Sequence, residues 1–253
     1  MSEKRFEGQV CIVTGAAGGL GQATAEVLAA EGGRVACVDI SGAAAEETAG
    51  DIRKAGGDAH AFTVDVSDFN SVETGVAAIA AEMGRPEVLI NCAGIGRFQH
   101  SHEVGADDWQ RILGVNLNGT FFMCRHTLPH LLEGGGNIVN IASNAGLMGQ
   151  PYSAAYCASK GGVVNLTRAL ADEYLERDVR VSCIAPGGIE TAIQKSFQET
   201  MPEGSNFKKL IRITSPLGNS QPIEIARFIA FVASEHGRYI TGTIHSMDGG
   251  LTR

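Results

Sequence analysis

The fold is decided near the N-terminus, where residues 10–21 read VCIVTGAAGGLG. Five apolar or β-branched residues there precede a turn with four glycines, and a helical pattern follows over residues 22–31. A strand, a glycine-rich turn and a helix N-terminus form an anion site, because backbone N–H groups and the helix dipole face the anion. Glycines matter because a side chain would hold the backbone away from a pyrophosphate. We therefore expect a dinucleotide to bind at Gly15, Gly18, Gly19, Leu20 and Gly21.

The glycine-rich turn leaves an alternative open. Thr24 stands where the third glycine of a Gly-x-Gly-x-x-Gly pattern would lie, and a plain strand-to-helix turn accounts for the other glycines about as well. Asp39 favours the dinucleotide, because it ends the next expected strand 18 residues after Gly21, near where a carboxylate binds the adenosine ribose hydroxyls. Such a carboxylate repels a 2′-phosphate, so Asp39 with its neighbour Ile40 favours NAD over NADP. The competing interpretation is that Asp39 or Ser41 begins the following helix as its N-cap.

Outward from this stretch, short apolar runs alternate with longer helical patterns. The expected strands lie at residues 10–14, 34–40, 59–64, 88–91, 137–142, 180–185 and 240–246. Continuous apolar strands separated by helices predict a parallel sheet that is covered on both faces. The fold class is therefore α/β, a doubly wound, mostly parallel Rossmann-type sheet of about seven strands with helices on both sides. Ligands of such sheets bind at the carboxyl ends of the strands.

No linker or internal repeat divides the chain, so we expect a single domain over residues 1–253. Residues 187–216 interrupt the alternation of strands and helices, because they contain no expected strand and only weak helical patterning. A connection of that length is typical of a lid or binding loop, and we assign it to the substrate. A surface excursion without a role is the alternative.

Composition excludes several classes of protein. The 253 residues carry a formal net charge of −8, which argues against a nucleic-acid partner or an anionic membrane surface. Hydrophobic residues make up 44% of the chain, enough for a large core, so extensive disorder is excluded. No apolar run is long enough to span a bilayer, and the polar N-terminus lacks a signal peptide. Six widely separated cysteines indicate reduced thiols and a cytoplasmic protein.

Three residues carry the pattern of an acid–base centre. Tyr156 and Lys160 lie one helical turn apart on the same face, and Ser143 follows an expected strand at the ligand edge of the sheet. A phenol with a pKa near ~10 is too weakly acidic to serve as a base at neutral pH. A cation at about 4 Å, in an effective dielectric of ~20, favours the phenolate by roughly 4 kcal/mol, or about three pK units. We therefore expect Lys160 to bring the pKa of Tyr156 near neutrality, and Ser143 to donate to the substrate oxygen.

Taken in order, these motifs resemble those of the single-domain short-chain dehydrogenase/reductase family, over nearly the whole chain. Residues 14–21 resemble the Thr-Gly-x-x-x-Gly-x-Gly turn of that family, and Tyr156 and Lys160 match its Tyr-x-x-x-Lys pair. Ser143 lies 13 residues before Tyr156, as is usual in the family. Residues 91–94 (NCAG) are similar to Asn-Asn-Ala-Gly, with a cysteine in place of the second asparagine, a departure that we expect to have little effect. Residues 248–250 (DGG) resemble the usual C-terminal ending.

The resemblance implies roles for further residues. Asn116 falls where the family keeps an asparagine in a proton relay to the lysine, which completes a catalytic set with Ser143, Tyr156 and Lys160. Tyr156 would be the acid and base of a hydride transfer between NAD(H) and a secondary alcohol or ketone, and Lys160 would also bind the nicotinamide ribose. Helices that carry Asn116 and Tyr156 pair across subunits in the family, so a homo-oligomer, commonly a tetramer, is expected. The remaining cofactor-binding residues implied are Asp65, Val66, Asn91, Ala93, Gly94, Pro186, Gly187, Ile189 and Thr191.

The substrate is a small molecule that the sequence defines only broadly. Phe98 and the apolar residues of the 187–216 loop favour an apolar or mid-sized alcohol, and steroid-like, acyl and sugar-alcohol substrates all stay open. Arg97 and Lys195 leave an anionic group as an alternative. Residues assigned to the substrate lie between Ser143 and Tyr156 or in the loop: Asn144, Gln150, Tyr152, Gly188, Ile193 and Phe197.

Other functions compete with this interpretation. His126 and His130 are one helical turn apart, but no third ligand is evident, so no metal site is expected. A methyltransferase does not need the Ser143, Tyr156 and Lys160 set, and an epimerase of this kind would usually need a larger substrate domain. A dinucleotide-binding sensor without catalytic activity is the remaining alternative on the same fold.

Overall fold

A seven-stranded, wholly parallel sheet forms the centre of the computed structural model, which describes residues 4–252. The strands lie in the order β3-β2-β1-β4-β5-β6-β7, and every neighbouring pair is parallel. The expected fold class is therefore confirmed. The strands are β1 (Val10–Thr14), β2 (Arg34–Asp39), β3 (Asp58–Thr63), β4 (Pro86–Asn91), β5 (Gly136–Ile141), β6 (Val179–Pro186) and β7 (Ile244–Met247).

The strand order reverses between β1 and β4. The chain moves outward from β1 to β2 and β3, then returns to pair β4 with the other side of β1, where Thr14 aligns with Asn91. The connection after β1 leads to one side of the sheet's centre and the connection after β4 leads to the other. Where two such neighbouring connections diverge, a crevice opens outside the carboxyl ends of the strands. This position places the glycine-rich turn after β1 at the edge of that crevice.

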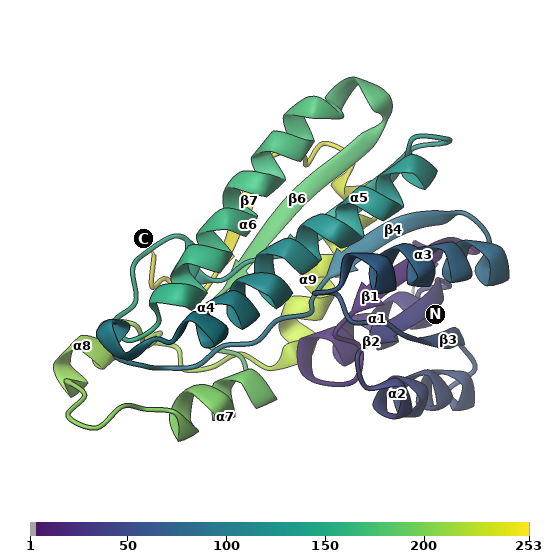
Figure 1. Cartoon of the computed structure of the whole chain (residues 1–253). Helices are drawn as coiled ribbons and strands as arrows, with labels where there is room; N and C mark the ends of the chain where they lie inside the picture. The colour runs from purple at the N-terminus through teal and green to yellow at the C-terminus, as the bar shows by residue number, and fades with distance from the viewer. Residues whose placement is uncertain (1–3, 253) are drawn as a thin grey trace.

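Helices cover both faces of the sheet (Figure 1). Cys11 and Val13 of β1 pack with α1, α2 and α9 on one face, and Ile12 packs with α3, α5 and α6 on the other, because successive side chains of a strand point to opposite faces. None of the helices within residues 4–252 is long and apolar enough to cross a membrane. The helices are α1 (Gly19–Ala30), α2 (Gly42–Lys54), α3 (Phe69–Met83), α4 (Ala106–Leu113), α5 (Gly119–Leu131), α6 (Ala154–Glu173), α7 (Ala192–Glu199), α8 (Phe207–Ile211) and α9 (Pro222–Ala233).

Local signals explain several element boundaries. The Asp68 side chain caps α3 by accepting a 2.7 Å hydrogen bond from the Ser71 backbone N–H. At α9, Pro222 occupies the first turn and the Glu224 carboxylate accepts from the Gln221 backbone N–H at 2.7 Å. A π-helical turn, Gly114–Asn118, joins α4 to α5. Such turns are frequent at functional sites, and this one contains Asn116.

Two expectations about the C-terminal third were wrong. The last strand begins at Ile244 instead of residue 240, because the left-handed φ of +67° at Gly242 interrupts an extended chain. The 187–216 loop is more regular than its pattern indicated, since it contains α7 and α8. In α7, Ile193 and Phe197 form an apolar face one turn apart and pack in one cluster with Tyr156. Figure 1 shows both short helices set apart from the layers around the sheet.

Substitution of Gly21 tests the packing of the glycine-rich turn against α1. A Cβ at Gly21 would lie closer than 3.0 Å to the Gly15 carbonyl oxygen, a backbone atom that cannot swing away. We expect Gly21→Ala to lower the free energy of unfolding by about 1–3 kcal/mol, measured by urea denaturation. Gly18→Ala is the matched control, because its Cβ would meet nothing within 4 Å and its φ of 175° suits any residue. Equal stability of the two variants would contradict this close packing.

Candidate active site

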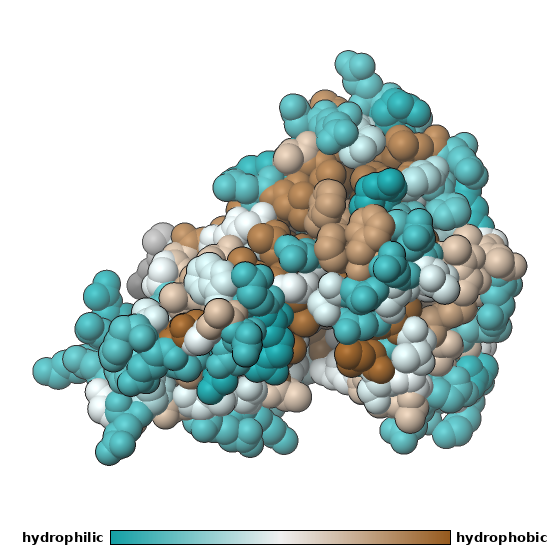
Figure 2. Space-filling view, in the orientation of Figure 1, coloured by the Kyte–Doolittle hydropathy of each residue, from teal (hydrophilic) through white to brown (hydrophobic). Residues whose placement is uncertain are grey.

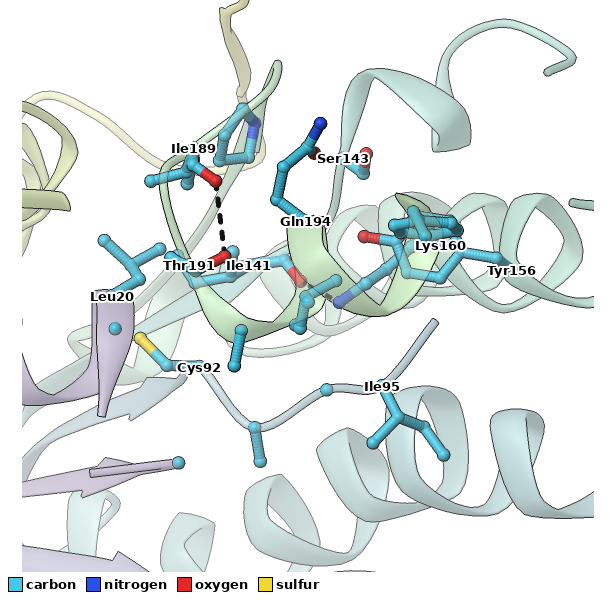
Figure 3. A pocket seen from close by; sticks show the side chains of 18 of the residues that line it. Leu20, Cys92, Ile95, Ile141, Ser143, Tyr156, Lys160, Ile189, Thr191 and Gln194 are labelled. Carbon is cyan, nitrogen blue, oxygen red and sulfur yellow. Dashed lines mark hydrogen bonds between the residues drawn. The ribbon is translucent and has the colours of Figure 1, made fainter. Parts of the chain in front are cut away.

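A cavity of about 870 Å³ opens at the carboxyl ends of the strands (Figure 3). Its walls come from the turn after β1, the ends of β2 to β6, and the helices α6 and α7. Nearly all of the predicted cofactor residues line this one cavity. They are Gly15, Gly18, Gly19, Leu20, Gly21, Asp39, Ile40, Asp65, Val66, Ala93, Gly94, Tyr156, Lys160, Pro186, Gly187, Ile189 and Thr191.

The glycine-rich turn lies close to the backbone at the end of β4. Gly15 has a left-handed φ of +69°, and a Cβ there would lie 3.0 Å from the Cα of Ala93. A Cβ at Gly19 would lie 3.1 Å from Cγ2 of Thr191, a residue of the segment after β6. Side chains at these positions would narrow the space between the two walls. The glycines therefore form a backbone cradle of the kind that a pyrophosphate requires.

Asp39 faces the cradle from the end of β2. One carboxylate oxygen accepts from the Ala17 backbone N–H at 3.2 Å, and the other accepts from the Ser41 backbone N–H at 3.0 Å. Of the two residues that could begin α2, Ser41 is its N-cap and Asp39 is not. Its carboxylate lies at the cavity wall beside Ile40, whose side chain is exposed.

Asn91 and Asn116 lie behind the cavity wall instead of on it. The Asn91 amide is buried and donates to Asn140 Oδ1 at 2.9 Å, which joins β4 to β5. Asn116, fully buried, accepts from the Ile95 backbone N–H at 2.8 Å and donates to the Ile95 carbonyl at 2.9 Å. Its amide also donates to Ser159 Oγ at 3.0 Å. Asn116 therefore joins the segment after β4 to α6 through hydrogen bonds. Its role in a proton relay stays a prediction.

Ser143, Tyr156 and Lys160 all line this cavity. Ser143 follows β5, and its hydroxyl accepts from the Ala145 backbone N–H at 3.1 Å. Figure 3 shows Tyr156 and Lys160 projecting from α6 into the cavity that Ser143 also lines. The buried Lys160 ammonium donates to the Ile141 carbonyl at 2.7 Å and lies 5.9 Å from the centroid of the Tyr156 ring.

The electrostatics of this pair differ from the sequence-based expectation. Burial raises the pKa of the Tyr156 phenol to about 12, and the nearby Ser143 hydroxyl opposes this only in part. Burial lowers the pKa of Lys160 to about 8, because it disfavours the charged form of each group. The structure therefore does not bring the pKa of Tyr156 near neutrality, because removal of the phenol from water raises that pKa and the Lys160 ammonium binds the Ile141 carbonyl.

The segment after β6 is fixed by the C-terminal residues. A Cβ at Gly187 would lie 2.9 Å from the Cα of Asp248, so these two backbones pack closely. The Asp248 carboxylate accepts from the backbone N–H groups of Gly250, Leu251 and Thr252. Residues 248–250 therefore position Gly187 and the cavity residues that follow it.

Of the six residues assigned to the substrate, five line the cavity: Asn144, Gln150, Gly188, Ile193 and Phe197. Asn144 Oδ1 accepts from Gln150 Nε2 at 3.0 Å and from the Ser143 hydroxyl at 3.1 Å, which links both amides to Ser143. Tyr152 does not line the cavity, and its hydroxyl accepts instead from the Asn206 backbone N–H at 2.9 Å.

Sequence reasoning missed several residues of the cavity wall. Gln194 and Gln198 lie one helical turn apart on α7, a spacing that would have been found if residues 192–199 had been recognised as a helix. Val115, which directly precedes Asn116 in the π-helical turn, also lines the cavity. Arg111 and Asn219 also line the cavity, but no local pattern marks them. Within residues 4–252, no group of three His, Cys, Asp or Glu side chains is arranged to hold a metal ion.

Known proteins resemble this chain over almost its whole length. The profile of the short chain dehydrogenase family matches residues 9–202. The chain is 40% identical over 251 residues to the uncharacterized oxidoreductase YxbG of Bacillus subtilis, covering 98% of this chain and 92% of that one. It is also 40% identical over 250 residues to D-threitol dehydrogenase of Mycolicibacterium smegmatis, covering 98% and 94%.

The fold is found in solved structures as well. The 3-ketoacyl-(acyl-carrier-protein) reductase of Brucella melitensis, complexed with NADH, superimposes with a TM-score of 0.88 at 33% identity, covering 98% of this chain and 99% of that one. With the glycine-rich cradle, the Tyr156–Lys160 pair and the match over residues 9–202, the chain belongs to the short-chain dehydrogenase/reductase family of oxidoreductases.

Proposed function

We propose that this protein transfers a hydride between NAD(H) and a secondary alcohol or ketone. The observation that carries the proposal is the meeting of Ser143, Tyr156 and Lys160 in the same cavity as a backbone cradle of glycines. A sensor without activity would need the cradle alone. The buried proton donor beside it, whose pKa is strongly perturbed, favours an enzyme.

The side chains of the site suggest how the reaction is divided among them. When bound, the nicotinamide supplies or accepts the hydride. In ketone reduction, the Tyr156 hydroxyl gives its proton to the substrate oxygen, while the Ser143 hydroxyl donates a hydrogen bond to the same atom. In alcohol oxidation, the phenolate takes the proton back. Lys160 keeps a positive charge near the phenol, which opposes part of the cost of forming a buried phenolate.

The preference for NAD rests on Asp39. Its carboxylate stands at the end of β2 and lines the cavity, where it can accept from the two hydroxyls of an adenosine ribose. Of the residues that line the cavity, only Arg111 and Lys160 are cationic. The Arg111 guanidinium is paired with Asp108 at 3.2 Å, and Lys160 binds the Ile141 carbonyl. A 2′-phosphate would therefore meet a carboxylate without a free cation to offset it.

The substrate that fits best is an uncharged, mid-sized alcohol or ketone. Phe98, Ile193 and Phe197 supply an apolar wall, and the amides of Asn144 and Gln150 lie beside Ser143. An anionic group is less favoured, because Arg97 is already paired with Asp108 at 2.8 Å and Lys195 is exposed and does not line the cavity. Residues 187–216 would then form the substrate-binding loop of a single catalytic domain.

We further propose that copies of the chain associate through the face of α4, α5 and α6, as the family resemblance implies. Figure 2 shows hydrophobic side chains gathered over α5 and the neighbouring part of α6. Trp109 of α4 and Phe121 of α5 are 37% and 43% exposed, although both are large apolar side chains. A second copy would cover this apolar surface, and a tetramer is the expected assembly.

A cytoplasmic location is supported by the state of the cysteines. All six are free thiols, and four of them are buried. Burial raises the pKa of Cys92 and Cys124 to about 12, which leaves little thiolate for oxidation at neutral pH. Such thiols suit a reducing compartment.

Replacement of Tyr156 tests the proposed reaction. We expect Tyr156→Phe to lower the rate of NAD⁺ reduction by roughly 10²- to 10⁴-fold, because the proton donor and acceptor is lost. NADH binding, measured by the fluorescence of the reduced nicotinamide, should stay nearly unchanged. The assay uses D-threitol, cyclohexanol and a 3-hydroxyacyl thioester as probes. Loss of NADH binding would mark Tyr156 as structural, and binding without turnover on every probe in the wild type would favour the sensor.

Two substitutions of Asp39 test the cofactor preference. Asp39→Ala should raise the KM for NAD⁺ by roughly 10- to 100-fold, because charge-assisted hydrogen bonds to the ribose are lost, and should relax the preference over NADP⁺. Asp39→Asn keeps an acceptor for the Ala17 N–H but removes the charge that repels a 2′-phosphate. The matched control is Asp51→Ala on the exposed side of α2. An unchanged ratio of kcat/KM for NAD⁺ and NADP⁺ in both Asp39 variants would exclude this role.

Light scattering after gel filtration tests the proposed assembly. We expect the wild type to elute as four chains and Phe121→Glu to dissociate, because a carboxylate would be buried in the apolar contact without a partner. Phe207→Glu, a change at an exposed position on α8 outside that face, should leave the assembly intact. A monomeric wild type would refute the proposal.

A further inference from the structure

The Tyr156 phenol is covered by an aromatic ring from the 187–216 loop. Phe197 of α7 packs edge-to-face on Tyr156, with ring centroids 5.1 Å apart and an angle of 80° between the rings. Both side chains are buried, at 9% and 8% exposure, in a cluster that also contains Ala145. The two residues lie 41 positions apart in the chain, so only the seating of α7 brings them together.

Three further contacts hold Phe197 in this position. The Phe98 ring also packs on Phe197, at a centroid distance of 4.7 Å. The Ser196 hydroxyl donates to the Gly96 carbonyl at 2.9 Å, and the Phe98 backbone N–H donates to Thr200 Oγ1 at 3.0 Å. These bonds fasten the C-terminal end of α7 to the segment after β4. Phe197 lies between the two bonded residues, Ser196 and Thr200, and so has little freedom to move away from Tyr156.

Gly96 is the point where the segment after β4 comes closest to both rings. A Cβ at Gly96 would lie closer than 3.0 Å to Phe197 Cζ and Cε2, and 3.1 Å from Tyr156 Cδ2. The φ of Gly96 does not lie in the left-handed region, so the backbone itself does not require glycine here. The requirement for glycine comes from space alone. Any side chain would displace one ring or the other.

We propose that Phe197 and Gly96 are positioning residues for the catalytic tyrosine: the Phe197 ring clamps the Tyr156 phenol and excludes water from one side of it, and Gly96 leaves the space in which the two rings meet. This inference rests on the proposed role of Tyr156 as the acid and base. It gives Phe197 a function beyond lining the substrate cavity. It also makes the position of the Tyr156 phenol depend on how α7 packs.

The clamp also affects when the phenol ionises. Burial is the main reason that the pKa of Tyr156 is raised, and Phe197 supplies part of that burial. On α6, Lys160 and Cys157 are the titratable neighbours of the phenol, and Ser143 contacts it from the end of β5. Lys195 and Glu199 of α7 are exposed, and Arg97 beside Gly96 is paired with Asp108. Phe197 therefore acts on the phenol through exclusion of water and not through charge.

Four variants test the clamp by rate. We expect Phe197→Ala to lower kcat for alcohol oxidation by roughly 10-fold, and Gly96→Ala by roughly 10- to 100-fold, because small displacements of a catalytic group are costly. The KM for NAD⁺ should change little in either. The double variant Gly96→Ala/Phe197→Ala should be about as active as Phe197→Ala alone, because the added methyl group then has room. Tyr239→Ala, which changes an exposed aromatic residue outside the 187–216 loop, is the control and should match the wild type.

Titration of the phenol tests the clamp independently of turnover. Tyrosinate absorbance of each protein is followed with pH, and the curve of its Tyr156→Phe counterpart is subtracted. In Phe197→Ala the Tyr156 phenol is more exposed to water, so its pKa should fall by about one pH unit relative to the wild type. The acid limb of the pH–rate profile should move to lower pH by the same amount. Phe197→Leu, which keeps an apolar cover, should retain the wild-type titration.

The outcomes separate this inference from the proposed function. An unchanged titration of Tyr156 in Phe197→Ala would overturn the clamp, whether or not the enzyme turns over any probe alcohol. A double variant that is slower than both single variants would also overturn it, because the two positions would then act separately. A shifted titration in a protein without turnover would leave the clamp standing and refute only the proposed reaction.

Discussion

Close contact between backbones at the carboxyl ends of β1 and β4 is the constraint on which the site depends. Gly15 and Gly21 allow the turn after β1 to fold back on itself and to lie against Ala93, with no side chain between these backbones. The same contact leaves the N-terminus of α1 facing the crevice that the strand order opens. The cradle for a pyrophosphate is therefore built from the packing that holds the centre of the sheet together.

Burial governs the chemistry of the other half of the cavity. Lys160 has a single hydrogen-bond acceptor at the Ile141 carbonyl, and its pKa falls because the charge is removed from water. Tyr156 responds in the opposite direction, since its charged form is the deprotonated one. Burial therefore widens the pH range over which Tyr156 and Lys160 are both neutral, compared with the same groups in water. The 187–216 loop contributes to this through Phe197, which closes one side of the phenol.

Much of the fold could be predicted because the signals are local. β1 ends where its apolar run meets Gly15, and the parallel sheet follows from apolar strands separated by helices. Prediction was weaker where tertiary contacts decide. The short α7 is stabilised by Ser196 and Thr200 binding the segment after β4, about 100 residues earlier in the chain, so its sequence carries only a faint pattern. β7 begins late because Gly242 takes a left-handed conformation that the neighbouring apolar residues do not reveal.

Local sequence patterns place the chemical groups that reach the carboxyl edge of the sheet: a glycine-rich turn after β1, Asp39 after β2, Ser143 after β5, and Tyr156 and Lys160 on one face of α6. Periodicity and strand endings are enough to place such groups, because both are properties of the backbone. How those groups ionise depends on their surroundings in the folded chain. The distance of Lys160 from the phenol, the aromatic cover over Tyr156 and the space left at Gly96 depend on atoms from distant segments. Desolvation sums over all of these neighbours, and no local stretch of sequence contains them.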